Sequence, residues 1–361
     1  MAFPALPSHR RLLMKKTFTV AISAVHLLTL LAMMVQGAID SSVLKSVADI
    51  NDKGPYLGLV IPNAFELYPF LNTSIFSLDS IIDISGRRFY AGEVEGLRVL
   101  AVMTGLGMLN TGITTQLLLT YFNINGVLHY GIAGNADDEL NIGDIIIPQY
   151  WAHMGLWDWK RYAGNSSGRK LYKMAKGDFF EAEDFGCLEI GNFNDPLENG
   201  SNLLSKLCYE AEEVLSVKGT PETVEQHFWV PVDEDYYQIA AQITSKGLDL
   251  ERCTSDSSCL SQAPQVLTVS RGASANIFVD NAAYRSFLHS YFNVSLVDEE
   301  SAGVALTCLT NNISFIAFRA LSDLAGGSDE ANEAPIFYNL AATNAVIVLT
   351  EFIRMLSWTS S

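Results

Sequence analysis

The chain has 361 residues, of which 49% are hydrophobic, and it carries a formal net charge of −17. A protein this acidic repels phosphate backbones and anionic membrane surfaces, which excludes nucleic acid as a partner. Its length is sufficient for one large hydrophobic core that also carries an insertion.

Residues 1–38 show the three zones of a secretory signal peptide. Four basic residues at positions 10–16 precede an apolar run at 18–35, and the segment ends on Gly37 and Ala38. A membrane anchor is the alternative, but polar residues interrupt the run, so the signal peptide is favoured. Cleavage would remove four positive charges and no negative ones, which changes the formal charge from −17 to −21. We expect the mature chain, residues 39–361, to be soluble and free of the membrane.

The rest of the chain is typical of a protein that is exported through an oxidising compartment to the vacuole or the cell exterior. Its Asn-x-Ser/Thr sequons are candidate glycosylation sites. They begin at Asn72, Asn165, Asn199, Asn293 and Asn312.

The five cysteines suggest disulfides and one thiol. Cys253 and Cys259 lie in a polar, turn-rich stretch, which favours a short disulfide loop. A metal site is the alternative there, but no histidine or further cysteine lies nearby, so we expect no metal. Cys187 with Cys208 is a second pairing that the sequence leaves open. Cys308 lies in an apolar helical pattern, which is typical of a buried free thiol.

The hydrophobic pattern from residue 56 onward alternates between strands and helices. The predicted strands span 56–62, 89–94, 97–103, 127–131, 142–148, 266–269 and 313–320. The predicted helices span 109–122, 281–292 and 300–309, and a further helix closes the chain. Buried apolar strands between helices indicate a three-layer α/β fold, in which helices cover both faces of a mixed, mainly parallel sheet. The irregular stretch at 151–264 is interpreted as an insertion within this single domain.

Ligands in open α/β sheets bind at the carboxyl ends of strands, where four clusters of this sequence lie. Two are the glycine-containing segments 104–107 and 131–134, whose backbone amides would be open to a sugar or an anion. Alone this is a weak signal, because glycine pairs after strands more often simply form a tight turn. The other two are acidic: residues 298–300, for which a structural helix cap is the alternative, and Asp323.

Cleavage of an N-glycosidic bond requires carboxylates, because the sugar becomes oxocarbenium-like while the base leaves with negative charge. One carboxylate that accepts hydrogen bonds from two ribose hydroxyls fixes the sugar and offsets its positive charge. A second carboxyl near the base can deliver a proton to the leaving nitrogen. Glu300 and Asp323 are the candidate catalytic pair.

Six segments resemble, in order and spacing, the blocks of the nucleoside phosphorylase and methylthioadenosine nucleosidase family. They read GLVIP at 58–62, MTGLGMLNTG at 103–112, HYGIAG at 129–134, NIGDIIIP at 141–148, VDEESAGVA at 297–305 and FRALSD at 318–323. The signal peptide, the sequons and the long middle insertion resemble the plant branch of this family, which includes bark and vegetative storage proteins.

The resemblance implies that a purine nucleoside or its base is the small-molecule partner. Glu300 would then bind the ribose hydroxyls, Asp323 would face N7 of the purine, and Ile277 with Phe278 would line the base pocket. The remaining candidate substrate contacts are Glu299, Gly105, Gly107, Gly131, Ala133 and Gly134. We expect no cofactor, with phosphate as the co-substrate if the reaction is phosphorolysis, and we expect a homo-oligomer.

The chain departs from the family at the anion site. Phosphorylases carry an arginine after the first strand and nucleosidases a water-activating glutamate, whereas this chain has Leu67 there, with Glu66 one residue away. Near the third glycine block, where phosphorylases have an arginine and then a serine or threonine, it has His129 and Ile132. Neither leucine nor isoleucine replaces the charge and the bidentate hydrogen bonds that an arginine offers to phosphate.

His129 and Glu66 are therefore the candidates for an altered anion site. A lone histidine at a strand end is, however, more often a core residue with its hydrogen bonds satisfied. Arg88, Arg271 and Arg319 are further cations, but nothing in the sequence places them at this site.

Two functions remain open from the sequence. The first is an enzyme that cleaves the N-glycosidic bond of a purine nucleoside, by phosphorolysis or by hydrolysis, and the retained Glu300 and Asp323 favour it. The second is a storage glycoprotein, a nutrient reservoir that keeps the fold after losing the phosphate site. The missing anion contacts favour this second function.

Overall fold

The computed structural model describes residues 40–160, 185–191, 204–220, 223–327 and 332–359. The chain divides into two compact units, Met1–Ala48 and Asp49–Ser361. The described part of the first unit is the beginning of helix α2, Ser41–Asn51, which continues into the second unit. The predicted signal peptide at 1–38 and the sequons at Asn165 and Asn199 lie outside the described residues.

A ten-stranded mixed sheet forms the centre of the second unit. Its strands are β1 (Tyr56–Ile61), β2 (Ser77–Ile84), β3 (Arg87–Val94), β4 (Leu97–Met103), β5 (Ile124–Asn135), β6 (Ile145–His153), β12 (Val230–Pro231), β13 (Val266–Ser274), β14 (Val294–Asp298) and β15 (Phe315–Leu324). They follow the order β12-β6-β13-β14-β5-β1-β4-β3-β2, and β15 pairs with both β5 and β6. β1 is parallel to β4 and β5, β15 is parallel to β5, and β13 is parallel to β6 and β14, so the central strands run mainly in parallel as predicted.

Burial explains why the central strands could be predicted. Every residue of β1 and β14 is buried, and in β15 only Leu324 at its end is partly exposed. Strands that are covered on both faces favour continuous apolar runs. The paired strands at 89–94 and 97–103 are confirmed as β3 and β4. The sequence did not predict β2, because most of its residues are exposed and leave a weak hydrophobic pattern.

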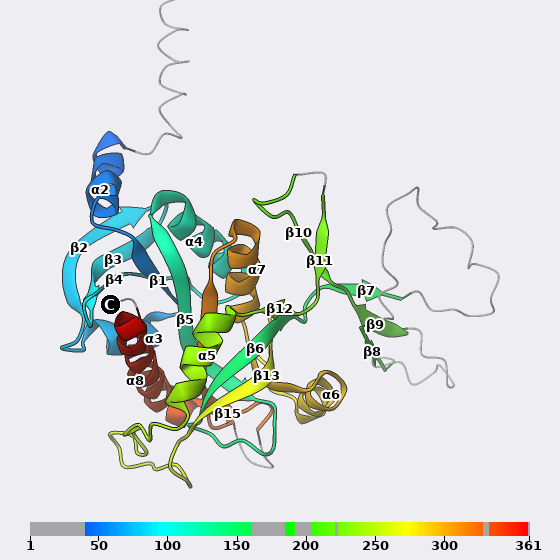
Figure 1. Ribbon diagram of the computed structural model, residues 1–361. Helices are drawn as coiled ribbons and strands as arrows, with labels where there is room; N and C mark the ends of the chain where they lie inside the picture. Colours follow the sequence, from blue (N-terminus) through cyan, green and yellow to red (C-terminus); the bar gives the residue numbers. More distant parts are fainter. Residues whose placement is uncertain (1–39, 161–184, 192–203, 221–222, 328–331, 360–361) are drawn as a thin grey trace, which may run out of the picture. The chain divides into compact units, whose positions relative to one another are not determined.

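Helices cover both faces of the sheet (Figure 1). They are α3 (Ala64–Leu71), α4 (Met108–Tyr121), α5 (Glu234–Ile243), α6 (Ala282–Phe292), α7 (Ser301–Asn311) and α8 (Ala334–Thr359). On one face α4 and α7 pack together, α4 next to β1 and β4 and α7 next to β6 and β13. On the other face α5 packs on α8, which crosses β15 and β5. These layers position the carboxyl ends of the strands around one site.

The stretch predicted as an insertion is only partly separate from the core. β6 extends the main sheet to His153, and β12 returns to pair with it, with Val230 opposite Trp151. Between them lie two small sheets, formed by β7 (Trp157–Trp159), β8 (Cys187–Glu189) and β9 (Lys206–Tyr209), and by β10 (Glu212–Val214) and β11 (Glu225–His227). Because β12 and α5 belong to the main layers, the part of 151–264 that lies outside these layers is shorter than the sequence predicts.

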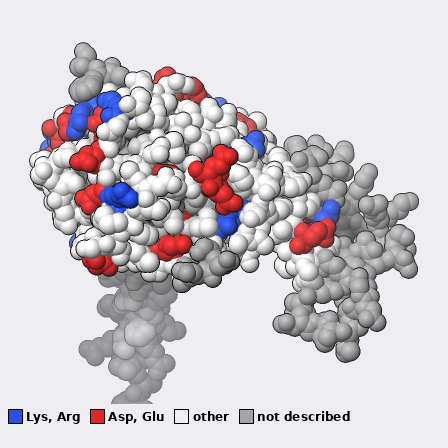
Figure 2. Space-filling view, turned by 90° about the horizontal axis from the view of Figure 1, so that it is seen from below, with Lys and Arg blue, Asp and Glu red and all other residues white. Residues whose placement is uncertain are grey.

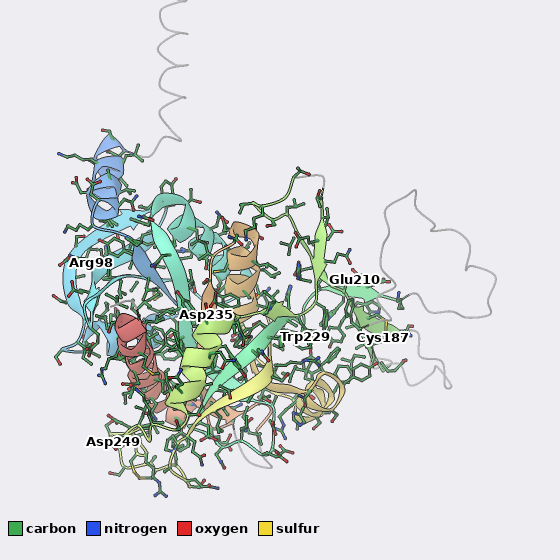
Figure 3. The ribbon with its side chains drawn as sticks, in the orientation of Figure 1. Arg98, Cys187, Glu210, Trp229, Asp235 and Asp249 are labelled. Atoms are coloured by element: carbon green, nitrogen blue, oxygen red, sulfur yellow. A yellow bond between two sulfur atoms is a disulfide. The ribbon has the colours of Figure 1, made fainter. Side chains whose placement is uncertain are left out.

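A cation–π contact connects the end of this inserted segment to the main sheet. The guanidinium carbon of Arg271 on β13 lies 4.4 Å from the centre of the Trp229 ring, and Arg271 Nη1 donates to Phe292 O at 2.9 Å. Figure 3 labels Trp229 where the segment rejoins the sheet, with Cys187 and Glu210 farther out. Arg271 therefore stabilises the fold, since its guanidinium is already engaged.

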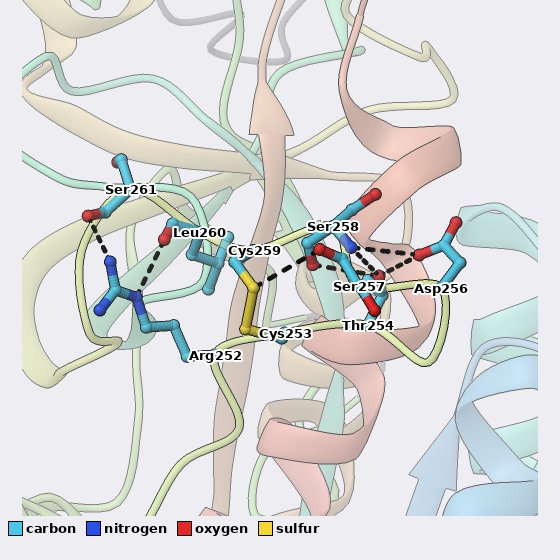
Figure 4. The surroundings of a disulfide bond; sticks show 9 residues. All are labelled: Arg252, Cys253, Thr254, Asp256, Ser257, Ser258, Cys259, Leu260 and Ser261. Atoms are coloured by element: carbon cyan, nitrogen blue, oxygen red, sulfur yellow. Dashed lines mark hydrogen bonds between the residues drawn. A yellow bond between two sulfur atoms is a disulfide. The ribbon is translucent and has the colours of Figure 1, made fainter.

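Two disulfides lie within the described residues. Cys253 and Cys259 form the short loop that the sequence predicts (Figure 4). Cys187 and Cys208 form the second disulfide, which joins β8 to β9, so the pairing that the sequence left open is present. Cys308 is a buried free cysteine, as expected.

The described sequon asparagines all lie on the surface. Asn72, Asn293 and Asn312 are exposed at the carboxyl ends of α3, α6 and α7. Each position is open to a glycan. On the face drawn in Figure 2, acidic and basic side chains are scattered between larger areas of other residues.

Among the described residues, one helix is long and apolar enough to cross a membrane. It is α8, over Ala334–Ser357, and 67% of its most apolar window is buried inside the fold. The core helix of a soluble protein has the same properties, and here the helix covers one face of the sheet.

Candidate functional site

A pocket opens where β1, β4, β5, β14 and β15 end. Its volume is ≈ 260 Å³, close to the lower end of the roughly 300–1,000 Å³ that is typical of small-molecule sites. Its carboxylates are Glu66, Asp298, Glu299, Glu300 and Asp323. Its larger apolar side chains are Phe65, Leu106, Ile132, Ile277, Phe278 and Val297. The pocket therefore combines an apolar wall with an unusual concentration of acidic groups.

A buried arginine lies behind this pocket and holds its carboxylates together. Arg319 lies in the middle of β15 and is 0% exposed. Its Nε lies 2.8 Å from Asp298 Oδ2, its Nη2 donates to Glu300 Oε2 at 3.4 Å, and its Nη1 lies 4.0 Å from Glu66 Oε1. One positive charge thus faces three buried carboxyl groups, so the charges do not balance unless some carboxyls are protonated.

Glu66 reaches the pocket because helix α3 begins at Ala64. Asn63 caps the helix: its side chain accepts from Glu66 N at 3.3 Å, and Glu66 Oε2 accepts from Asn63 N at 3.1 Å. The other carboxylate oxygen accepts from Ile132 N at 2.7 Å. This capping box fixes both oxygens of the Glu66 carboxylate at the end of β1.

The structure corrects the sequence analysis at this point. Leu67 packs into the core with 3% of its surface exposed, and it does not line the pocket, whereas Glu66 does. Burial raises the pKa of Glu66 to about 8, the negative charge of Glu300 adds to the rise, and Arg319 opposes it. The residue after the first strand that faces the pocket is therefore a titratable glutamate.

Glu300 precedes helix α7 and is held by the loop that follows β4. Its Oε1 accepts from Gly107 N at 3.0 Å. Gly107 has a φ of 92°, a conformation that favours glycine, so this contact depends on the glycine that the sequence singled out. Burial raises the pKa of Glu300 to about 7, and Arg319 opposes the rise. Glu300 is therefore a second carboxyl that titrates near neutral pH.

Asp323 lies near the end of β15 and lines the pocket. Ser322 Oγ donates to its Oδ1 at 2.7 Å, and Asn332 Nδ2 donates to its Oδ2 at 3.0 Å. Burial raises the pKa of Asp323, and these two hydrogen bonds oppose the rise. Asp323 and Glu300, the candidate catalytic pair, thus line the same pocket.

The other predicted contacts fall into two groups. Those that line the pocket are Glu299, Ala133, Gly134, Ile277 and Phe278. Those that do not line it are Gly105, Gly107 and Gly131. A Cβ atom on Gly131 would lie 2.4 Å from Arg319 Nη1 and 2.5 Å from Glu66 Oε1, so a glycine is needed for these two groups to approach each other.

His129 has the core role that the sequence analysis favours over anion binding, and it does not line the pocket. His129 is 0% exposed, and its Nδ1 lies 2.7 Å from Val60 O, which requires the proton on that nitrogen. Its Nε2 therefore accepts a hydrogen bond from Arg319. Burial and the neighbouring Arg319 hold the pKa of His129 well below its usual range, so the ring stays neutral. Glu66, the other candidate for this site, would repel an anion when ionised.

The remaining arginines do not supply an anion site either. Arg88 pairs with Asp83 at 2.8 Å on the exposed surface, and Arg271 packs on Trp229. Arg319 lies behind the lining, so no lysine or arginine in the described part of the chain lines the pocket. A phosphate ion would face carboxylates there.

The raised pKa values predict how stability depends on pH. Glu66 and Glu300 have folded-state pKa values of about 8 and about 7, above their ordinary value of 4.5. Between pH 4.5 and these folded-state pKa values, the folded state binds more protons than the unfolded state. The stability that this proton binding contributes is therefore lost as the pH rises through that range. We expect the free energy of unfolding to fall from pH 5 to pH 8, by up to about 1.4 kcal/mol per pH unit for each group. Urea titrations of the wild type and of Glu66→Gln, in which the decline should be shallower, test this; equal slopes would contradict it.

Comparison with known proteins agrees with this fold. The sequence profile of the Phosphorylase superfamily matches residues 57–354. Bark storage protein A of Populus deltoides is 33% identical over 330 residues, which cover 89% of this chain and 97% of that protein. A 5'-methylthioadenosine/S-adenosylhomocysteine nucleosidase of Listeria innocua is 24% identical over 285 residues, 79% of this chain and 93% of that protein. The chain therefore belongs to the Phosphorylase superfamily.

Solved structures show the same architecture. A 5'-methylthioadenosine/S-adenosylhomocysteine nucleosidase from Helicobacter pylori matches with a TM-score of 0.55 at 17% sequence identity, covering 83% of this chain and 98% of that one. Identity at this level establishes the fold, a nucleosidase-like α/β fold, and leaves the activity to be argued from the site.

Proposed function

We propose that the protein is a purine nucleosidase, which cleaves the N-glycosidic bond of a purine nucleoside with water. One observation carries this proposal: Glu66, Glu300 and Asp323 line one pocket, each with a raised pKa, and no cation of the described residues lines it. Hydrolysis needs a general base, a group that stabilises the sugar cation and a general acid, and three carboxyls in one pocket can supply all three.

The proposed reaction assigns one role to each carboxyl. Glu66 takes a proton from a water molecule, whose oxygen bonds to C1' of the ribose while the bond from C1' to N9 breaks. The bonding electron pair leaves with the base, and Asp323 delivers a proton to N7. The products are the free purine and the free sugar. Glu300 accepts hydrogen bonds from the 2' and 3' hydroxyls and offsets the positive charge of the sugar in the transition state.

The environment of Glu66 suits a general base. A pKa of about 8 gives its carboxylate more affinity for a proton than an exposed glutamate has, which favours transfer of a proton from water. Ile132 N and Asn63 N each donate to one carboxylate oxygen, so the group is held in one orientation. A fixed base loses less freedom when water and substrate assemble next to it.

The comparisons support water as the nucleophile. Several relatives are named nucleosidases, and one solved nucleosidase with this fold, from Colwellia psychrerythraea, is in complex with adenine. Its TM-score is 0.55 at 17% identity. Phosphorolysis would need a cation at the anion position, and the described pocket lining offers carboxylates and Ile132 instead.

A storage function is the second candidate, and a specific observation favours it. Bark storage proteins A and B of Populus deltoides are 33% and 34% identical to this chain over 89% and 77% of its length. In this alternative the protein would be a glycoprotein of the secretory route, held in the vacuole or outside the cell, whose pocket binds but does not cleave. The three pocket carboxyls weigh against it, because buried carboxyls cost stability that a nutrient reservoir has no reason to give up.

Two substitutions in the pocket test the assigned roles. Glu300→Gln keeps the shape but removes the charge that strengthens the hydrogen bonds to the ribose diol, so nucleoside affinity should fall by about 1–3 kcal/mol. Free purine should bind almost as before. Asp323→Asn should weaken binding of both ligands, because it alters the group that faces the base.

Calorimetry with a purine riboside and its base measures these effects. Glu213→Gln, on the exposed surface of β10, is the matched control and should bind both ligands as the wild type does. Equal losses for both ligands in Glu300→Gln, together with a lower Tm, would mean that Glu300 stabilises the fold through its contacts with Gly107 and Arg319 rather than binding the sugar. If Glu300→Gln loses affinity for the riboside alone, and the wild type releases no purine, the storage alternative would be supported.

A further inference from the structure

Asn332 lies between two carboxylates at one side of the pocket. Its Nδ2 donates to Asp323 Oδ2 at 3.0 Å and to Asp280 Oδ1 at 3.3 Å. Asp280 directly follows Val279, a lining residue of the segment that also carries Ile277. One amide group thus connects the candidate general acid to the segment that lines the base side of the pocket.

A third hydrogen bond fixes which way this amide points. Asn332 Oδ1 accepts from Ala334 N at 2.8 Å, at the first residue of α8. A backbone N–H requires an acceptor, and the amide nitrogen cannot provide one, so the oxygen must face the helix. Both protons of the NH₂ group are then directed at carboxylates, one at Asp323 and one at Asp280.

We infer that Asn332 is a positioning residue, which orients the carboxyl of Asp323 for proton transfer to the purine and tunes when that carboxyl releases its proton. The inference rests on the proposed function. Ser322 holds Oδ1 of Asp323 and Asn332 holds Oδ2, so the plane of the carboxyl is fixed from both sides. Without Asn332, a single hydrogen bond would leave the group free to rotate.

The charges around Asp323 determine the direction of the effect. The groups that face it are Ser322 on β15, Asn332 and Glu333 at the start of α8, and Asp280 before α6. The two donors favour the ionised carboxyl, whereas burial, Glu333 and Asp280 favour the protonated one. Loss of Asn332 would leave Asp323 next to two like charges with one donor fewer, so it would keep its proton to higher pH.

Asn332→Ser isolates this role from the structural one. A serine hydroxyl can also accept from the backbone N–H two residues on, so Ala334 N keeps an acceptor, but the serine side chain is too short to bridge the two carboxylates. Asn51→Ser is the matched control. Asn51 also makes two contacts with the backbone, to Tyr121 O at 2.9 Å and from Asn123 N at 2.8 Å, near the residues where β1 and β5 begin.

The direct measurement is the ¹³C NMR titration of the Asp323 carboxyl carbon, assigned by its loss in Asp323→Asn. We expect the titration midpoint to move to higher pH in Asn332→Ser and to stay at the wild-type value in Asn51→Ser. The pH dependence and the rate of purine release should change as well. The alkaline limb of its pH profile should move in the same direction, and kcat should fall roughly 10-fold, less than the roughly 100- to 10,000-fold that general acid–base catalysis contributes.

A second variant keeps the test decisive if Asn332→Ser does not fold. Asp280 is exposed, and Asp280→Asn removes a like charge, so the midpoint of Asp323 should move to lower pH. A midpoint that neither variant moves would overturn the inference. If the wild type releases no purine, the proposed function fails, and the NMR titration alone then decides whether Asn332 controls Asp323.

Discussion

Replacing Glu66 with glutamine is expected to lower kcat for purine release by roughly 100- to 10,000-fold, the contribution that is typical of a general base. Glutamine has nearly the same size, and its one acceptor oxygen can keep one of the two hydrogen bonds that Glu66 accepts from Ile132 N and Asn63 N, but it cannot take a proton from water. Affinity for the free purine should change little. Steady-state rates and calorimetry of the same preparation measure both effects.

The pH profile adds a second readout for Glu66. In the wild type, activity should rise as the pH approaches about 8, because the carboxyl must lose its proton before it can act as a base. Glu213→Gln serves again as the control and should keep the wild-type rate and profile. A Glu66→Gln enzyme that cleaves as fast as the wild type would show that another group activates the water.

Replacing Arg319 with methionine should cause the largest loss of stability, about 3–5 kcal/mol, because three buried carboxyls lose their common cation. The loss should be larger at pH 8 than at pH 5, since protonation relieves the carboxyls at low pH. Urea denaturation at both pH values measures the free energy of unfolding.

An exposed arginine provides the comparison for this effect. Arg88 forms a bidentate pair with Asp83, but both side chains are more than half exposed. Arg88→Met should therefore cost at most about 1 kcal/mol. Equal losses for Arg319→Met and Arg88→Met would mean that the buried cluster is not held together by the charge of Arg319.

Much of the fold could be predicted from the sequence, because the central elements have unambiguous local patterns. The apolar runs at 56–62 and 313–320 became β1 and β15, strands with both faces covered. The helix at 281–292 begins at the capping residue Asn281. The pairing of β12 with β6, by contrast, involves two residues and depends on contacts between distant segments, which no local pattern encodes.

The candidate site shows how one residue of register can change a functional prediction. The family pattern puts Leu67 at the position of the water-activating glutamate, with Glu66 one residue away. The spacing of Asn63 and Glu66 is that of a capping box, a local signal that fixes where α3 starts and hence which side chain faces the pocket. This local signal favours Glu66, which the sequence already marks as a candidate, over Leu67.

Other parts of the site arise only from the tertiary fold. In the sequence Arg319 is one charged residue within an apolar strand, and its three carboxylate partners come from β14, from α3 and from the residue before α7. Asn332 contacts Asp323 and Asp280, the latter 52 positions away in the sequence. A buried charge in a strand does indicate that partners exist, but not which residues they are.

The most direct test of the proposed function is the release of purine from a purine riboside by the purified protein, with and without phosphate. Water as nucleophile predicts release of free base and free sugar in phosphate-free buffer, at a rate that added phosphate does not raise. Release that requires phosphate, with a sugar phosphate as product, would contradict the nucleosidase proposal. No release under either condition, while purine still binds, would identify a storage protein instead.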